Sequence, residues 1–119
     1  MRADVDSAPR WPRHLDVLLV EDSEQDAELT LRILRRHALA QRVVWVRDGA
    51  EALSCLFGQA EAADVPLAVR PRVVLLDIKM PRLDGHSVLR RVKSDPRTRD
   101  IPIVVMSSSN VERDIAASL

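Results

Sequence analysis

The sequence is poor in cysteine, since Cys55 is the only cysteine among its 119 residues. A single thiol can form neither an intrachain disulfide nor a cysteine-based zinc cage. A lone cysteine is also typical of proteins that work in a reducing compartment. We therefore expect a cytoplasmic protein whose fold does not depend on disulfides.

The sequence also lacks an excess of charge of one sign, and it contains no long apolar run. Its 18 basic residues are balanced by 18 acidic ones, whereas a nucleic-acid-binding domain usually carries a basic excess. No stretch approaches the roughly 18 consecutive apolar residues of a membrane span. The polar segment 1–13 does not have the pattern of a signal peptide. We expect neither a nucleic acid nor a membrane among the partners.

The length and composition fit one globular domain. The 119 residues are 46% apolar and 30% charged, which is ordinary for such a domain. Residues 1–14 are polar and contain several arginines and prolines, so we expect them to form a flexible N-terminal tail in which Trp11 is exposed. Residues 15–119 are expected to form the domain.

Four short apolar runs alternate with segments that have helical patterns. The expected strands are residues 16–20, 43–46, 73–76 and 103–106. Ser23, Asp48 and Asp84 stand where side-chain oxygens would cap the N-termini of three helices. The second of these helices should span about 49–57 and end at Gly58, and a fourth should occupy 111–119.

The alternation of strands and helices predicts an α/β fold with a doubly wound parallel sheet. Right-handed crossovers leave few topologies for so short a chain. The flavodoxin-like strand order 2-1-3-4 is the natural one. In that order the ligand site lies at the carboxyl ends of the strands, where the first and third strands are neighbours.

Acidic side chains follow the two strands that should be neighbours at this edge. Glu21 and Asp22 follow the first strand, and Asp77 follows the third. Two carboxylates about 4 Å apart repel by roughly 4 kcal/mol at an effective dielectric constant of about 20. A divalent cation would remove this cost, and an all-oxygen site open to water suits Mg²⁺. The alternative is that such acids only cap helices, and we adopt it for Asp48 and Asp84.

Four motifs resemble the response-regulator receiver domain of two-component signalling. They are Leu-Leu-Val-Glu-Asp-Ser at 18–23, Val-Val-Leu-Leu-Asp-Ile-Lys-Met-Pro at 73–81, Asp-Gly at 84–85 and Pro-Ile-Val-Val-Met-Ser at 102–107. The resemblance runs from about Leu15 to Leu119. Segment 48–57 and the long connection after it resemble single-domain receivers that partner phytochrome-type histidine kinases.

The resemblance implies a role for each residue at the carboxyl edge. Asp77 would accept a phosphoryl group from a phosphohistidine of a sensor histidine kinase. Asp22 and Asp77 would ligate Mg²⁺ directly, Glu21 would act through metal-bound water, and the backbone carbonyl of Lys79 would be a further ligand. Ser107 would donate its hydroxyl to the phosphate in the active state. The chain would not be an enzyme, but a phosphoacceptor that assists its own phosphoryl transfer and hydrolysis.

The family also has a lysine on a fifth strand, followed by a fifth helix. The chain as given ends at Leu119, in the expected fourth helix. From this we expect residues 103–106 to be an edge strand that a second copy of the chain covers, which gives a homo-oligomer. A longer chain that is disordered beyond Leu119 and a rearranged fourth helix are the alternatives.

A second reading of the sequence is a receiver-like interaction module that works without phosphorylation. Phosphodonor labelling with and without Asp77→Asn separates it from the first. A phosphatase with an aspartate nucleophile would need an acid where Lys79 stands. A nucleotide-binding protein is disfavoured because neither G-x-G-x-x-G nor G-x-x-x-x-G-K-[ST] occurs.

Overall fold

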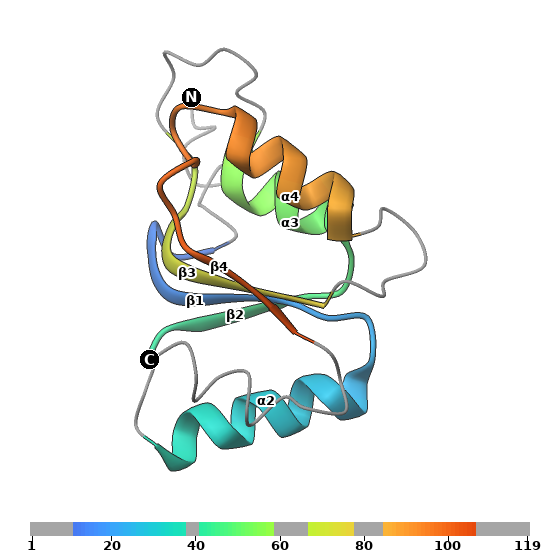
Figure 1. Ribbon diagram of the computed structural model, residues 1–119. Coiled ribbons are helices and arrows are strands. Elements are labelled where there is room, and N and C mark those ends of the chain that lie inside the picture. Colours follow the sequence, from blue (N-terminus) through green and yellow to red (C-terminus); the bar gives the residue numbers. More distant parts are fainter. Residues whose placement is uncertain (1–10, 38–40, 59–66, 78–84, 107–119) are drawn as a thin grey trace, which may run out of the picture.

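A computed structural model describes residues 11–37, 41–58, 67–77 and 85–106 (Figure 1). Strands and helices alternate along the chain in the predicted order. The elements are β1 (His14–Val20), α2 (Glu24–Arg36), β2 (Val43–Val46), α3 (Gly49–Phe57), β3 (Arg70–Asp77), α4 (Gly85–Ser94) and β4 (Ile103–Met106).

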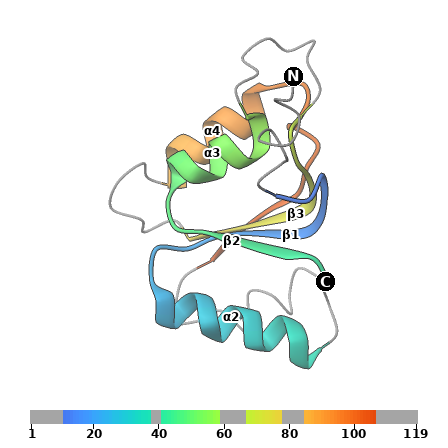
Figure 2. The ribbon, with the colours of Figure 1, turned by 180° about the vertical axis from the view of Figure 1, so that it is seen from behind.

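The four strands form one parallel sheet in the order β2-β1-β3-β4. Helices α3 and α4 lie on one face of the sheet and α2 lies on the other (Figures 1 and 2). Strand β1 is central, and its last residue, Val20, pairs with Val46 on one side and with Leu76 on the other. The predicted doubly wound fold and its strand order are therefore confirmed.

The two faces of the sheet bury separate apolar clusters. Leu18 and Val20 of β1 belong to the cluster under α3 and α4, whereas Val17 and Leu19 belong to the cluster under α2. Successive strand residues point to opposite faces, so a strand covered on both sides must be apolar throughout. Cys55 is fully buried in the first cluster, which confirms that it is a small core residue.

Side-chain caps begin two of the helices as the sequence predicts. The Ser23 hydroxyl accepts a hydrogen bond from the Asp26 amide (3.3 Å) at the start of α2. The Asp48 carboxylate accepts one from the Glu51 amide (2.7 Å) at the start of α3. Helix α3 ends at Gly58, whose φ of 60° lies in the left-handed region that favours glycine. The predicted cap Asp84 and the predicted helix 111–119 lie outside the described residues.

The amino ends of β1 and β3 differ from the predictions. Strand β1 begins at His14, which the sequence placed in the tail, and β3 begins at Arg70 rather than at Val73. The two extensions pair with each other, His14 with Arg70, so each stabilises the other although neither has a strand pattern of its own. Trp11 is only partly exposed and packs against the core, and its predicted exposure is wrong.

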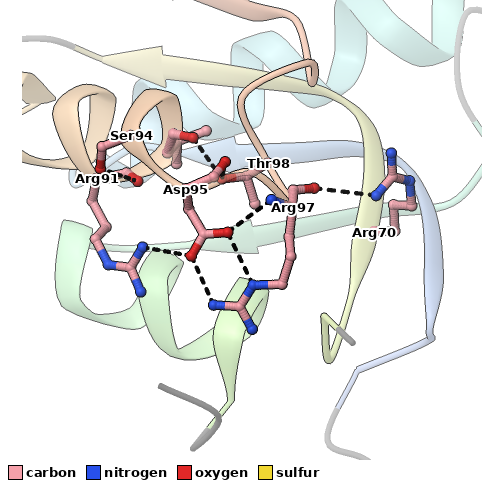
Figure 3. A network of polar contacts seen from close by, with 7 residues as sticks. Arg70, Arg91, Ser94, Asp95, Arg97 and Thr98 are labelled. Atoms are coloured by element: carbon pink, nitrogen blue, oxygen red, sulfur yellow. Dashed lines mark hydrogen bonds and ion pairs between the residues drawn. The ribbon is translucent and has the colours of Figure 1, made fainter. Parts of the chain in front are cut away.

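The connection between α4 and β4 is held by a buried carboxylate. Asp95 accepts hydrogen bonds from Arg97 through the backbone N–H, Nε and Nη2 (2.8, 2.9 and 2.7 Å) and from Nη1 of Arg91 (3.0 Å) (Figure 3). The Arg91 guanidinium lies 4.0 Å from the ring centre of Phe57 on α3. The backbone carbonyl of Arg97 accepts a hydrogen bond from Arg70 on β3 (3.2 Å). This network ties α3, α4 and β3 together at the amino ends of the strands.

No helix within the described ranges combines the length and the apolar character that crossing a membrane requires.

Asp95→Asn should lower the free energy of unfolding at neutral pH by about 1–3 kcal/mol, because it removes the charged acceptor shared by two arginines. The Arg97 guanidinium holds the pKa of Asp95 well below its usual 3.8. The stabilisation that the Asp95 carboxylate gives the folded state is therefore complete above pH 3.8 and is lost as the pH falls through the lowered pKa. Urea unfolding at neutral and acidic pH measures both effects. Asp100→Asn, at an exposed position nearby, is the control and should change little.

Candidate functional site

Three carboxylates meet at the carboxyl edge of the sheet. Glu21 and Asp22 come directly after β1, and Asp77 is the last residue of the neighbouring strand β3. One carboxylate oxygen from each residue lies within 4.8 Å of the other two. The predicted convergence of these acids is therefore confirmed. No other group of three potential metal-ligating side chains occurs in the described parts of the chain.

The three acids differ in their exposure to solvent. Glu21 and Asp77 are 1% and 5% exposed, whereas Asp22 is an exposed residue. The cluster thus has two buried carboxylates at its base and one at its solvent-facing rim. Within the described residues, Asp22 is thus the member of the cluster that is in contact with solvent.

Several hydrogen bonds fix Glu21 in place. Its backbone N–H donates to the carbonyl of Val46 (3.0 Å), and its Oε2 accepts from the backbone N–H of Ser23 (3.1 Å). Its backbone carbonyl accepts from the indole Nε1 of Trp45 on β2 (2.8 Å). A part for Trp45 in the site could not be predicted from the sequence, because nothing in the local pattern of β2 pairs it with a residue 24 positions earlier.

The crowding of carboxylates has a clear electrostatic consequence. Burial, followed by hydrogen bonding with Asp77, raises the pKa of Glu21 from 4.5 to about 8. The Ser23 amide acts in the opposite direction, but it does not outweigh burial and the neighbouring charges of Asp77 and Asp26. At neutral pH the Glu21 carboxyl is therefore stabilised by holding a proton, and a bound cation could replace that proton.

The remaining candidates from the sequence fall into two groups. Lys79, Pro81 and Ser107 lie outside the described residues. Asp48 caps α3 and takes no part in the acidic cluster, as predicted. The histidines do not join the cluster either: His14, His37 and His86 are all exposed at separate places on the surface.

Comparison with known proteins identifies the family. The family model for the response regulator receiver domain matches residues 17–119. Response regulator Rcp1 of Synechocystis sp. is 37% identical over 102 residues, a match that covers 86% of this chain and 67% of Rcp1. The probable methanogenesis regulatory protein FilR2 of Methanothrix harundinacea is 40% identical over 99 residues, and the match covers 83% of this chain and 61% of FilR2. The chain thus spans about two thirds of these curated relatives.

Solved structures of related proteins agree with the family model. The bacteriophytochrome response regulator AtBRR is 43% identical, with a TM-score of 0.67 and coverage of 90% of this chain and 76% of AtBRR. The Mn²⁺-bound form of Rcp1 is 36% identical, with a TM-score of 0.65 and coverage of 90% of this chain and 73% of Rcp1. These TM-scores indicate that both relatives share the overall fold described above.

The parallel sheet and the carboxylates at its edge define an α/β protein of the receiver type. The chain belongs to the response regulator receiver domain family, which acts in phosphorylation-based two-component signalling.

The raised pKa of Glu21 predicts a pH-dependent stability. The folded chain keeps a proton that the unfolded chain releases between pH 4.5 and about 8, so the free energy of unfolding should fall as the pH rises through this range. Glu21→Gln should flatten this dependence, with a change of about 1 kcal/mol or more between the two ends of the range.

Urea unfolding with a chelator of divalent cations present measures this dependence. Glu28→Gln, at an exposed position of α2, is the matched control and should keep the original slope. Equal slopes for the Glu21 variant and the unsubstituted chain would contradict the assignment.

Proposed function

We propose that this receiver accepts a phosphoryl group on Asp77 from a sensor histidine kinase and thereby switches a protein–protein interaction. The observation that supports this most directly is the placement of Asp77. Asp77 is 5% exposed and ends a central strand, and a carboxylate oxygen of this residue lies within 4.8 Å of those of Glu21 and Asp22. A purely structural role would not require three acids to share one edge.

The proposed reaction is a nucleophilic transfer. A carboxylate oxygen of Asp77 forms a bond to the phosphorus of a phosphohistidine, and the bond from that phosphorus to the imidazole nitrogen breaks. The imidazole leaves with the electron pair of the broken bond. Asp77 becomes an aspartyl phosphate, which water later hydrolyses. The chain is thus a phosphoacceptor that assists its own phosphoryl transfer and hydrolysis, and we do not propose a separate enzymatic activity.

The donor set of the cluster fits Mg²⁺. The three side chains of the cluster all offer carboxylate oxygens, and Asp22 is exposed to water, which Mg²⁺ retains when bound. We propose direct ligation by Asp22 and Asp77, water-mediated contact with Glu21, and a further bond from the backbone carbonyl of Lys79. When bound, the ion would neutralise negative charge on the phosphoryl oxygens.

Ser107 is the proposed switch residue. It follows β4, whose last residue Met106 pairs with Asp77. In the sequence, Ser107 therefore comes one residue after the strand partner of the proposed phosphoacceptor. Its donation to an aspartyl phosphate would couple the state of Asp77 to the segment after β4.

Partners and compartment follow from the family relationship. Relatives that include a bacteriophytochrome response regulator support a phytochrome-type histidine kinase as the phosphoryl donor. We propose that this exchange takes place in the cytoplasm, because a sequence with a single cysteine, which cannot form an intrachain disulfide, suits a reducing compartment.

Self-association through β4 is also part of the proposal. Within the described residues, β4 pairs with β3 alone, and Val105 is 43% exposed. An apolar strand edge of this kind favours pairing with a second copy.

Asp77→Asn should abolish phosphorylation, because an amide oxygen is not a competent phosphoacceptor. The measurement is the transfer of radiolabelled phosphate to the full chain from an acyl phosphate and from a phytochrome-type histidine kinase. Asp100→Asn is the control and should be labelled like the unsubstituted chain. Equal labelling of the Asp77 variant would show that another residue is the phosphoacceptor. An unsubstituted chain that is not labelled would favour a phosphorylation-independent interaction module.

Asp22→Ala should weaken Mg²⁺ binding by about tenfold or more, since even the loss of a group that only orients a ligand costs 10- to 100-fold. Calorimetric titration gives the affinity, and Trp45 fluorescence provides a second signal. Asp100→Ala, remote from the cluster, is expected to bind Mg²⁺ normally. An unchanged titration for the Asp22 variant would show that the metal assignment is wrong.

A further inference from the structure

We propose that Trp45 is a positioning residue for the acidic cluster, a role that rests on the proposed metal-dependent function. Its indole N–H donates to the backbone carbonyl of Glu21 at 2.8 Å. That carbonyl belongs to the peptide unit that joins Glu21 to Asp22. Through this hydrogen bond Trp45 sets the direction in which both carboxylates leave the backbone.

The hydrogen bond replaces one that the sheet can no longer supply. Trp45 lies on β2 and pairs with Leu19 of β1. The parallel ladder continues beyond β1 as far as the bond from the Glu21 N–H to the Val46 carbonyl (3.0 Å). The next bond in such a ladder would come from the backbone N–H of Asp48, but the chain turns there into α3, for which Asp48 is the N-cap. The indole N–H gives the Glu21 carbonyl its donor.

With this bond, β2 engages both backbone polar groups of Glu21. The peptide unit is planar and rigid, so hydrogen bonds to both the N–H and the carbonyl of Glu21 restrain its φ and ψ. They thereby restrain the direction of its Cα–Cβ bond and the position of the Asp22 Cα. The side chains of Glu21 and Asp22 must reach the same point beside Asp77, where their oxygens lie within 4.8 Å. A rotation of this peptide unit would separate them. The bond therefore restrains a peptide unit on which the geometry of the cluster depends.

A second contact holds the indole itself. The Arg47 guanidinium lies 4.4 Å from the centre of the Trp45 ring, a cation–π contact that restrains the ring plane. The backbone N–H of Arg47 donates to Oε1 of Glu51 (3.0 Å), and the Glu51 N–H donates to Asp48 (2.7 Å). This capping arrangement fixes the residue that carries the guanidinium. The N-terminus of α3 thus supports Trp45, and Trp45 supports the acidic cluster.

Trp45→Phe tests this role, because it keeps an aromatic ring on β2 and removes the N–H donor. We expect Mg²⁺ affinity, measured by calorimetry on the full chain, to fall by about three- to tenfold, the effect of losing one hydrogen bond. Trp11→Phe is the matched control. It removes the other tryptophan, which packs against the core under α3 and α4, and Mg²⁺ affinity should stay within about twofold of the parent chain.

Two outcomes separate this role from the proposed function. If the parent chain binds Mg²⁺ and Trp45→Phe binds it equally well, the positioning role is wrong and the metal site stands. If the parent chain does not bind Mg²⁺, both are overturned.

A second measurement does not require the Trp45 variant to fold. In the Trp11→Phe protein, the single indole N–H signal in the NMR spectrum belongs to Trp45. We expect this proton to exchange with solvent at least about tenfold more slowly than a free indole, because it is hydrogen-bonded. Its chemical shift should move when Mg²⁺ binds to the cluster. Exchange at the rate of a free indole, or a chemical shift that does not change at saturating Mg²⁺, would overturn the proposal.

Discussion

Repulsion between buried carboxylates is the constraint on which the site depends. The parallel pairing of β1 and β3 places Val20 beside Leu76, so the acids that follow these residues must lie side by side. Burial of the Glu21 carboxyl, followed by its hydrogen bond with Asp77 and the repulsion from that acid, raises the pKa of Glu21. A proton or a cation relieves this repulsion. The site thus has a built-in affinity for positive charge, which suits a protein that receives an anionic phosphoryl group.

A buried acid near the amino ends of the strands has a pKa shift in the opposite direction. Asp95 is also buried, but Arg97 and Arg91 surround it, and its pKa is lowered. There the carboxylate is a structural acceptor that joins α4 to neighbouring elements (Figure 3). Burial alone therefore does not make a functional acid. Among the described residues, what distinguishes Glu21 and Asp77 is that each has two further carboxylates within 4.8 Å.

Much of the fold could be predicted because its signals are local. Apolar runs with β-branched residues gave the strands, and Ser23 and Asp48 gave helix starts that the capping hydrogen bonds confirm. The acidic cluster could be predicted too, since the alternation of elements implies the topology and the topology makes Glu21 and Asp77 neighbours. The predicted strand boundaries are wrong where pairing between distant segments determines the length of a strand. His14 and Arg70 extend their strands only because each pairs with the other.

The sequence by itself determined the class of fold, the helix boundaries set by caps, and the identity of the acids at the carboxyl edge. Each of these depends on residues a few positions apart or on the order of the elements. Only the tertiary structure decided how far the pKa of Glu21 is raised, and that the indole N–H of Trp45 donates a hydrogen bond to the Glu21 carbonyl. Those properties depend on burial and on hydrogen bonds between residues far apart in the chain, for which no local pattern exists.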